Sequence, residues 1–177
     1  MRLFIGIGLP APVAGALAKS APSLVPPAAA SKISWTPPSN MHITLSFLGQ
    51  VHEARVTAIE QILARIHAPR LLLELNGIGT FEWVGVLCAD VKSTSSLLAL
   101  AEKVVVTMET CGFKREGRPY APHVTLARSR DRLRLRPNAG DDPVFHQNFE
   151  ATEFRLYRSL TVSGGAKYEV LRSFPLD

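Results

Sequence analysis

Short apolar stretches typical of strands alternate along this chain with longer stretches in which apolar residues recur every three to four positions, as on one face of a helix. The second spacing predicts helices over Glu53–His67 and Thr94–Thr110, and Gly112 marks the end of the latter. A short Ala-rich helix is predicted over Pro12–Ser20, followed by a loop at Ala21–Ala30. The predicted strands are Arg2–Leu9, Ile33–Trp35, His42–Leu48, Arg70–Glu82, Trp83–Val91, His123–Ala127, Ala151–Ser159 and Lys167–Phe174.

These elements predict a single α+β domain that covers residues 1–177. A chain of 177 residues is long enough to bury a sizeable core. With 46% hydrophobic and 20% charged residues, the composition is that of a globular and not a disordered protein. No Gly/Ser-rich or charged linker divides the chain, so we expect no separable second domain.

The chain carries 20 basic and 15 acidic residues, and this net charge of +5 favours anionic partners such as phosphates or nucleic acid. Glycines and prolines interrupt the apolar N-terminal stretch, which therefore indicates a strand and a turn and not a secretion signal. No stretch approaches the ~18 uninterrupted apolar residues of a membrane span. Cys88 and Cys111 form no metal-binding spacing and are typical of buried residues in a reducing compartment. We expect a cytoplasmic monomer that makes no membrane contact.

One pattern occurs twice, as HITL at residues 42–45 and as HVTL at residues 123–126. In a strand, residues two apart point to the same face, so His42 lies beside Thr44 and His123 beside Thr125, over an apolar opposite face. The two copies suggest two similar lobes within one domain. If their strands face each other, two imidazoles and two hydroxyls converge on one site.

Two imidazoles suit in-line attack at phosphorus. With an ordinary pKa near 6.5, one imidazole can accept a proton from water while the other donates one to a leaving sugar oxygen. The Thr44 and Thr125 hydroxyls can bind the non-bridging phosphate oxygens. Arg128 and Arg130 follow the second motif closely and are candidates to offset the phosphate charge.

The histidines and threonines of the two motifs could also have structural or metal-binding roles. A single HxT strand would be weak evidence for catalysis, because Thr favours strands and a lone His is more often structural. Two histidines without neighbouring carboxylates or thiolates are too few ligands for zinc, so we expect neither metal nor cofactor. The three further histidines lack the partner threonine and are expected at the surface: His52, His67 and His146.

Three residues next to the motifs have both a functional and a structural interpretation. Phe47 and Tyr120 are candidates to stack on a nucleobase, although aromatic residues at strand ends also belong to cores. Asn40 either orients the first motif or caps a turn, and the turn is the simpler interpretation.

Together with their flanks, the two motifs make the sequence resemble a known family. The stretches "WTPPSNMHITLSFLG" and "PYAPHVTLAR" resemble the two motifs of the 2H phosphoesterase superfamily. Within it, the chain is similar to the RNA 2′,3′-cyclic phosphodiesterases, historically called 2′-5′ RNA ligases. "RLFIGIGLP", "FRLYRSL" and "GGAKYEVL" are similar to the opening and closing strands of that family, so the resemblance covers most of the chain.

The resemblance implies a bilobal α+β fold in which two antiparallel sheets face a central groove, with helices on the outside. It implies metal-independent hydrolysis of a terminal RNA 2′,3′-cyclic phosphate to a 2′-phosphomonoester, a step of RNA processing. It further implies that His42 is the general acid and His123 the general base, an assignment that spacing alone does not give.

Two further functions are compatible with the same residues. The paired His-Thr strands could hold RNA or a phosphate without turnover, although Lys or Arg would serve binding as well. A phosphodiesterase of the same kind could instead act on another cyclic phosphate, such as an ADP-ribose derivative, or on a 2′-5′ linkage.

Overall fold

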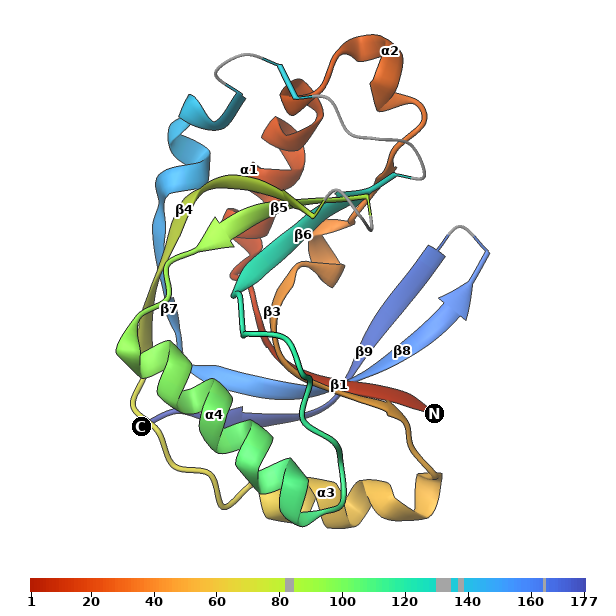
Figure 1. The fold of residues 1–177 in the computed structure, drawn as a ribbon, viewed down its shortest axis with the longest axis vertical. Helices are drawn as coiled ribbons and strands as arrows, with labels where there is room; N and C mark the ends of the chain where they lie inside the picture. The colour runs from red at the N-terminus through yellow and green to blue at the C-terminus, as the bar shows by residue number, and fades with distance from the viewer. Residues whose placement is uncertain (82–84, 130–134, 137–138, 164) are drawn as a thin grey trace.

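The computed structural model of the chain describes residues 1–81, 85–129, 135–136, 139–163 and 165–177 (Figure 1). Within these residues the strands form one nine-stranded antiparallel sheet in the order β7-β4-β5-β6-β3-β1-β8-β9, and β2 pairs with β6 beside this path. The strands are β1 (Arg2–Gly8), β2 (Ser34–Trp35), β3 (His42–Gln50), β4 (Leu71–Phe81), β5 (Val86–Val91), β6 (His123–Arg128), β7 (Asn148–Ala151), β8 (Glu153–Val162) and β9 (Gly165–Pro175).

Four α-helices and five short 3-10 turns connect the described strands. The α-helices are α1 (Ala11–Ser20), α2 (Pro27–Ala30), α3 (Val56–Leu63) and α4 (Ser95–Thr110). The 3-10 turns are η1 (Ala21–Leu24), η2 (Pro38–Asn40), η3 (Glu53–Arg55), η5 (Ala139–Asp141) and η6 (Pro143–His146).

The sheet consists of two halves that are joined by a single pair of residues. β1 pairs with β3 along its whole length, from Arg2 to Gly8, whereas β3 pairs with β6 only at Ile43 and Val124. One half is therefore β7-β4-β5-β6 and the other is β3-β1-β8-β9. Because Ile43 and Val124 are both fully buried, the two halves share one core at their junction.

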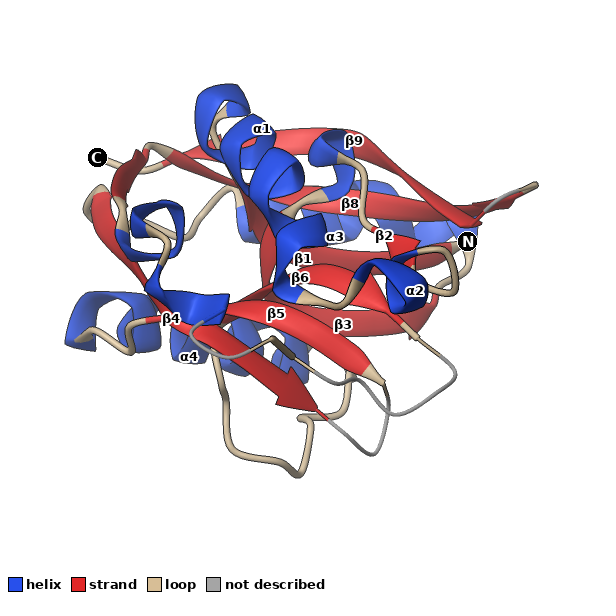
Figure 2. Cartoon of the chain, turned by 90° about the horizontal axis from the view of Figure 1, so that it is seen from above, coloured by secondary structure: helices blue, strands red, loops and turns tan. Residues whose placement is uncertain are grey.

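Helices α1, α3 and α4 contribute to the same buried cluster as the apolar strand residues, and α1 and α4 lie apart with strands between them (Figure 2). Thr94 caps α4, since its hydroxyl oxygen accepts a hydrogen bond from the Leu97 amide at 3.3 Å. Among the described residues, no helix is both long and apolar enough to cross a bilayer. Ile43 and Val124 point into this core, so the alternating side chains of His42 and His123 lie on the opposite face of the sheet, called here the histidine face.

The structure corrects the expectation of two separate sheets, because the two motif strands pair directly and make the sheet continuous. The alternation of apolar residues assigns each side chain to a face but does not say which strands are neighbours. The α+β class itself is confirmed.

Two local predictions were wrong in extent, and one short strand was not predicted. The stretch Ala21–Ala30 is not a plain loop: it holds η1 and α2, each with a proline in its first turn, where proline is well tolerated. Helix α3 ends at Leu63, yet the apolar spacing continues because Ile66 stays buried beyond the helix end. Strand β7 was missed, since it has only two buried residues, Phe149 and Ala151.

Candidate active site

The one pair that joins β3 to β6 consists of the central residues of the two HxT motifs. In an antiparallel arrangement the residues on either side of such a pair approach in reverse order. His42 therefore lies on the side of Thr125, and Thr44 lies on the side of His123. All four side chains are half-buried on the histidine face. The structure thus brings together the four residues that the sequence predicted as catalytic.

The His42 ring is held at both nitrogens. Its Nδ1 lies 2.7 Å from the main-chain oxygen of Asn40, and its Nε2 lies 3.1 Å from Oγ1 of Thr44. A carbonyl oxygen can only accept, so Nδ1 carries a proton. In the neutral ring, Nε2 is then the acceptor and the Thr44 hydroxyl donates to it.

His123 is oriented in the same way. Its Nδ1 donates to the main-chain oxygen of Ala121 at 2.8 Å, so in both motifs the acceptor is the carbonyl two residues before the histidine. The ring of Phe81 meets His123 edge-on, with centroids 4.9 Å apart. In both histidines Nε2 is consequently the nitrogen that can exchange a proton with a bound molecule.

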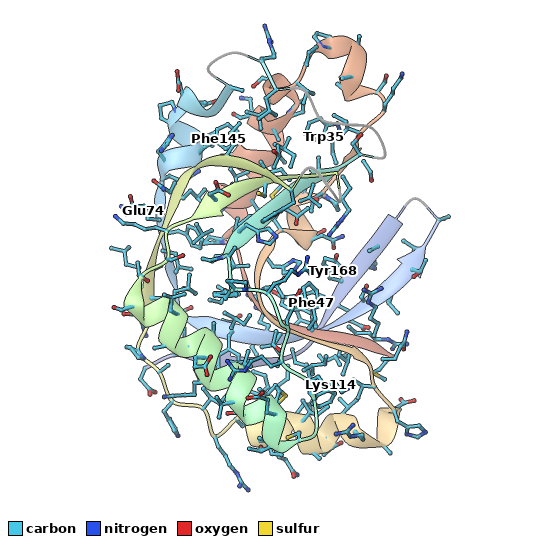
Figure 3. The ribbon with its side chains drawn as sticks, viewed as in Figure 1. Trp35, Phe47, Glu74, Lys114, Phe145 and Tyr168 are labelled. Carbon is cyan, nitrogen blue, oxygen red and sulfur yellow. The ribbon has the colours of Figure 1, made fainter. Side chains whose placement is uncertain are left out.

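Aromatic rings surround His42. Its centroid lies 4.6 Å from that of Phe4, 5.2 Å from that of Tyr168 and 5.8 Å from that of Tyr157. Phe4 and Tyr157 also stack on each other at 4.8 Å. Figure 3 shows the Tyr168 side chain of β9 near the middle of the molecule.

This environment changes the protonation of His42. Burial lowers the pKa of His42 to about 4, and the positive charges of His123 and Arg128 act in the same direction, against the hydrogen bond to the Asn40 carbonyl. His42 is therefore neutral at pH 7 in the free protein.

The candidate binding residues occupy different surroundings. Arg128 is exposed at the end of β6, beside the site. Phe47 is 57% exposed, with its ring 6.2 Å from Phe4. The ring of Tyr120 is half-buried against the core and its hydroxyl donates to the main-chain oxygen of Thr44 at 3.0 Å. Arg130 lies outside the described residues.

Sequence reasoning missed four residues that shape the site. The strand alternation in RLFIGIG does place Phe4 on the face opposite Leu3 and Ile5, and this signal could have been used. No local pattern could have found the others, because they reach the histidines only through the pairing of distant strands: Phe81, Tyr157 and Tyr168.

The remaining histidines lie at the surface, as predicted. His52 caps η3, His67 lies 3.6 Å from the Asp177 carboxylate, and His146 binds the main-chain oxygen of Gly140. Within the described ranges, no group of three or more His, Cys, Asp or Glu side chains is placed to hold a metal ion.

Cys88 is buried beside Thr125 in the pairing of β5 with β6. Burial raises the pKa of Cys88 to about 12, so it is a protonated thiol that donates to the Gly79 carbonyl at 3.3 Å and not a nucleophile.

The chain is similar to known proteins in both sequence and structure. Residues 7–86 match the family model of LigT-like phosphoesterases. The chain is 32% identical over 146 residues to the RNA 2′,3′-cyclic phosphodiesterase of Aeropyrum pernix, an alignment that covers 75% of this chain and 80% of the relative. It is 31% identical to that of Thermus thermophilus over 99% of this chain and 90% of the relative. The chain belongs to the LigT-like phosphoesterase family.

The fold of this LigT-like phosphoesterase agrees with solved structures of the family. The structure of Escherichia coli LigT complexed with 3′-AMP matches with a TM-score of 0.82 at 26% identity, over 99% of this chain and 97% of that one. The predicted resemblance to 2H phosphoesterases is therefore confirmed.

Proposed function

We propose that the chain hydrolyses the terminal 2′,3′-cyclic phosphate of RNA or of a nucleotide to a 2′-phosphomonoester. The observation that carries this proposal is the single Ile43–Val124 pair, since it sets two HxT motifs side by side. In both motifs Nδ1 binds a main-chain carbonyl, so Nε2 is left for the chemistry, and in His42 Nε2 contacts the Thr44 hydroxyl. Relatives along nearly the whole chain are named RNA 2′,3′-cyclic phosphodiesterases, which supports the same substrate class.

In this mechanism water attacks phosphorus opposite to the 3′ oxygen. His123 Nε2 accepts a proton from the water as its oxygen bonds to phosphorus. His42 Nε2 donates a proton to the 3′ oxygen as the bond between this oxygen and phosphorus breaks. The Thr44 and Thr125 hydroxyls bind the non-bridging oxygens, and the exposed Arg128 offsets their charge.

The acid role requires that His42 be protonated when substrate is present. In the free protein it is neutral, with a pKa of about 4. A bound phosphodiester brings a negative charge next to the imidazole, and an opposite charge within a few ångströms favours the charged form. Substrate binding therefore raises the pKa of His42, so that the imidazole takes up a proton from solvent and can donate it to the leaving oxygen.

The direct test is incubation with a nucleoside 2′,3′-cyclic phosphate followed by phosphorus NMR, with chromatography against 2′- and 3′-nucleotide standards. We expect the cyclic resonance to be replaced by that of a 2′-monoester. The double variant His42→Ala/His123→Ala is the control for contaminating activity. Binding without turnover would instead favour a phosphate-binding module. A clear preference for another cyclic phosphate in a substrate panel would keep the chemistry and change the substrate.

A further inference from the structure

Asn40 is the one buried polar side chain among the described residues, with 7% of its surface exposed. Both ends of its carboxamide are used. Nδ2 donates to the main-chain oxygen of Ala166 at 2.6 Å, and Oδ1 accepts from the main-chain N–H of Tyr168 at 3.2 Å. The turn-capping interpretation of Asn40 is therefore wrong, because its side chain binds a strand more than 120 residues away.

The contact closes the outer edge of β9. This strand is the last of the sheet, so one side of its backbone has no neighbouring strand. Ala166 and Tyr168 are two residues apart, and their free main-chain groups consequently point the same way. The carboxamide makes one donated and one accepted hydrogen bond with them, as a residue of a neighbouring strand would. It binds the start of β9, in the part of the β8–β9 hairpin that stands away from β6 in Figure 1.

The same residue also holds the first histidine. Its main-chain oxygen accepts the Nδ1 proton of His42 at 2.7 Å. Tyr168, whose main chain is bound by the Asn40 side chain, packs its ring edge-on against His42 at 5.2 Å. Three contacts thus link Asn40, His42 and Tyr168 to one another. The Asn40 carbonyl binds the His42 imidazole, this imidazole packs against the Tyr168 ring, and the Tyr168 main chain binds the Asn40 carboxamide.

The second motif has the contact from carbonyl to imidazole but no counterpart of the Asn40 carboxamide. Ala121 occupies the equivalent position, and its carbonyl holds His123 at 2.8 Å without any polar side chain. The carbonyl contact, with the edge-on ring of Phe81, therefore orients this imidazole without a buried carboxamide. The buried carboxamide of Asn40 must do something further, and what it contacts is the hairpin that carries Tyr168.

We propose that Asn40 is a positioning residue that ties the β8–β9 hairpin to the first motif, so that Tyr168 stays packed on His42 and excludes water from this imidazole. The catalytic consequence rests on the function proposed above, but the positioning itself does not. The groups that face His42 are Phe4 of β1, Tyr157 of β8, Tyr168 of β9 and, as charges, His123 and Arg128 of β6.

The experiment is an NMR titration of the His42 imidazole in the full chain without substrate. In Asn40→Ala the hairpin is released, water reaches the ring, and the pKa of His42 rises from about 4 towards its ordinary 6.5. Tyr168→Ala should give a rise of similar size, and Tyr168→Phe, which keeps the ring, should give none. In the double variant Asn40→Ala/Tyr168→Ala the two effects should not add, because both act through one contact.

Gln147→Ala is the matched control. The half-buried Gln147 carboxamide also donates to a main-chain oxygen, that of Val144 at 2.8 Å, but it lies outside the aromatic surroundings of His42. It should lower the unfolding temperature and leave the His42 titration unchanged. If Asn40→Ala behaved in the same way, Asn40 would only stabilise the fold and the proposal would be overturned.

A second variant and a kinetic measurement complete the test. Asn40→Ser keeps a hydroxyl in place of the carboxamide but is too short to span both main-chain groups, so it should shift the titration even if Asn40→Ala does not fold. With a cyclic phosphate, Asn40→Ser should lower kcat by roughly 10- to 100-fold, with little change in KM, because the acid is misplaced. Unchanged titration in Asn40→Ser overturns the positioning role. A wild-type protein without turnover overturns only the proposed function.

Discussion

The Tyr120 hydroxyl donates a 3.0 Å hydrogen bond to the main-chain oxygen of Thr44, and this bond links the segment before the second motif to the strand of the first. Burial raises the pKa of the Tyr120 phenol, so the hydroxyl stays protonated and remains a donor at all ordinary assay pH values. The bond therefore fixes the two motifs relative to each other beyond their one backbone pair.

Tyr120→Phe keeps the ring and removes only this bond. The Thr44 oxygen loses its partner, so we expect the free energy of unfolding to fall by about 0.5–1.5 kcal/mol in urea denaturation, and kcat to fall while KM stays close to that of the wild type. A role of Tyr120 in stacking on a nucleobase, which stays a prediction from the sequence, would give the opposite kinetics. Tyr120→Phe would then leave kcat and KM unchanged, and Tyr120→Leu would raise KM.

We expect His42→Ala and His123→Ala each to lower kcat by roughly 10²- to 10⁴-fold, the usual range for loss of a general acid or base. Thermal unfolding should show that both variants fold. His42→Ala should lose more stability, because its ring packs on Phe4 and Tyr168. The exposed His146→Ala is the control, with activity unchanged. Near-normal turnover of either motif variant would exclude the two-histidine mechanism.

The low pKa of His42 predicts a specific dependence of stability on pH. The folded value of about 4 lies below the ordinary 6.5, so between these values the unfolded chain binds a proton at His42 that the folded chain does not. The stabilisation from the neutral imidazole is complete above pH 6.5 and is lost as the pH falls through 4. Urea unfolding at several pH values should show this loss in the wild type and a smaller one in His42→Gln.

The histidine face could be predicted from the sequence because it depends on local chemistry. The HxT spacing needs only the two-residue period of a strand, which assigned His42, Thr44, His123 and Thr125 to one face correctly. The helix over Ser95–Thr110 could also be predicted, since its cap and apolar spacing lie within one continuous segment.

The remaining features of the site depend on contacts between distant segments. The pairing of Ile43 with Val124 decides that the sheet is continuous, and no pattern within either strand contains this information. Asn40 is another example, because its partners lie on β9 and a sequence shows only the turn in which Asn40 sits. Side-chain alternation thus gives the faces, while strand order and cross-sheet contacts need the folded chain.

We expect turnover of a cyclic phosphate to persist in excess EDTA. Two imidazoles and two hydroxyls already supply the proton transfers and the contacts to phosphate in the proposed mechanism. The measurement is the initial rate after dialysis against the chelator, with an EDTA-sensitive phosphodiesterase assayed in parallel. An activity that EDTA removes and that zinc or manganese restores would require a metal in the reaction.

The assignment of acid and base can be tested through the leaving group. His42 is neutral in the free protein, a state that by itself would suit a base, and it acts as the acid only if bound phosphate raises its pKa. A bell-shaped dependence of kcat/KM on pH cannot decide this, because its two limbs belong to the pair of histidines. A substrate with sulfur in place of the 3′ bridging oxygen can decide it. A thiolate leaves without a proton, since thiols have pKa values of about 8.5, far below those of sugar hydroxyls.

We therefore expect the sulfur substrate to restore much of the activity lost in His42→Ala and none of that lost in His123→Ala. A thiol reagent follows release of the 3′ thiol and so measures the rate of each variant with the sulfur substrate. The oxygen substrate, assayed in parallel, gives the activity that each variant has lost relative to the wild type. The threonines and Arg128 are the same in both variants, so a selective recovery reports proton donation and not phosphate binding. Recovery in His123→Ala alone would exchange the two roles, and the natural substrate would then have to lie with its 3′ oxygen beside His123. Recovery in neither variant would mean that His42 acts on the phosphate oxygens and not on the leaving group.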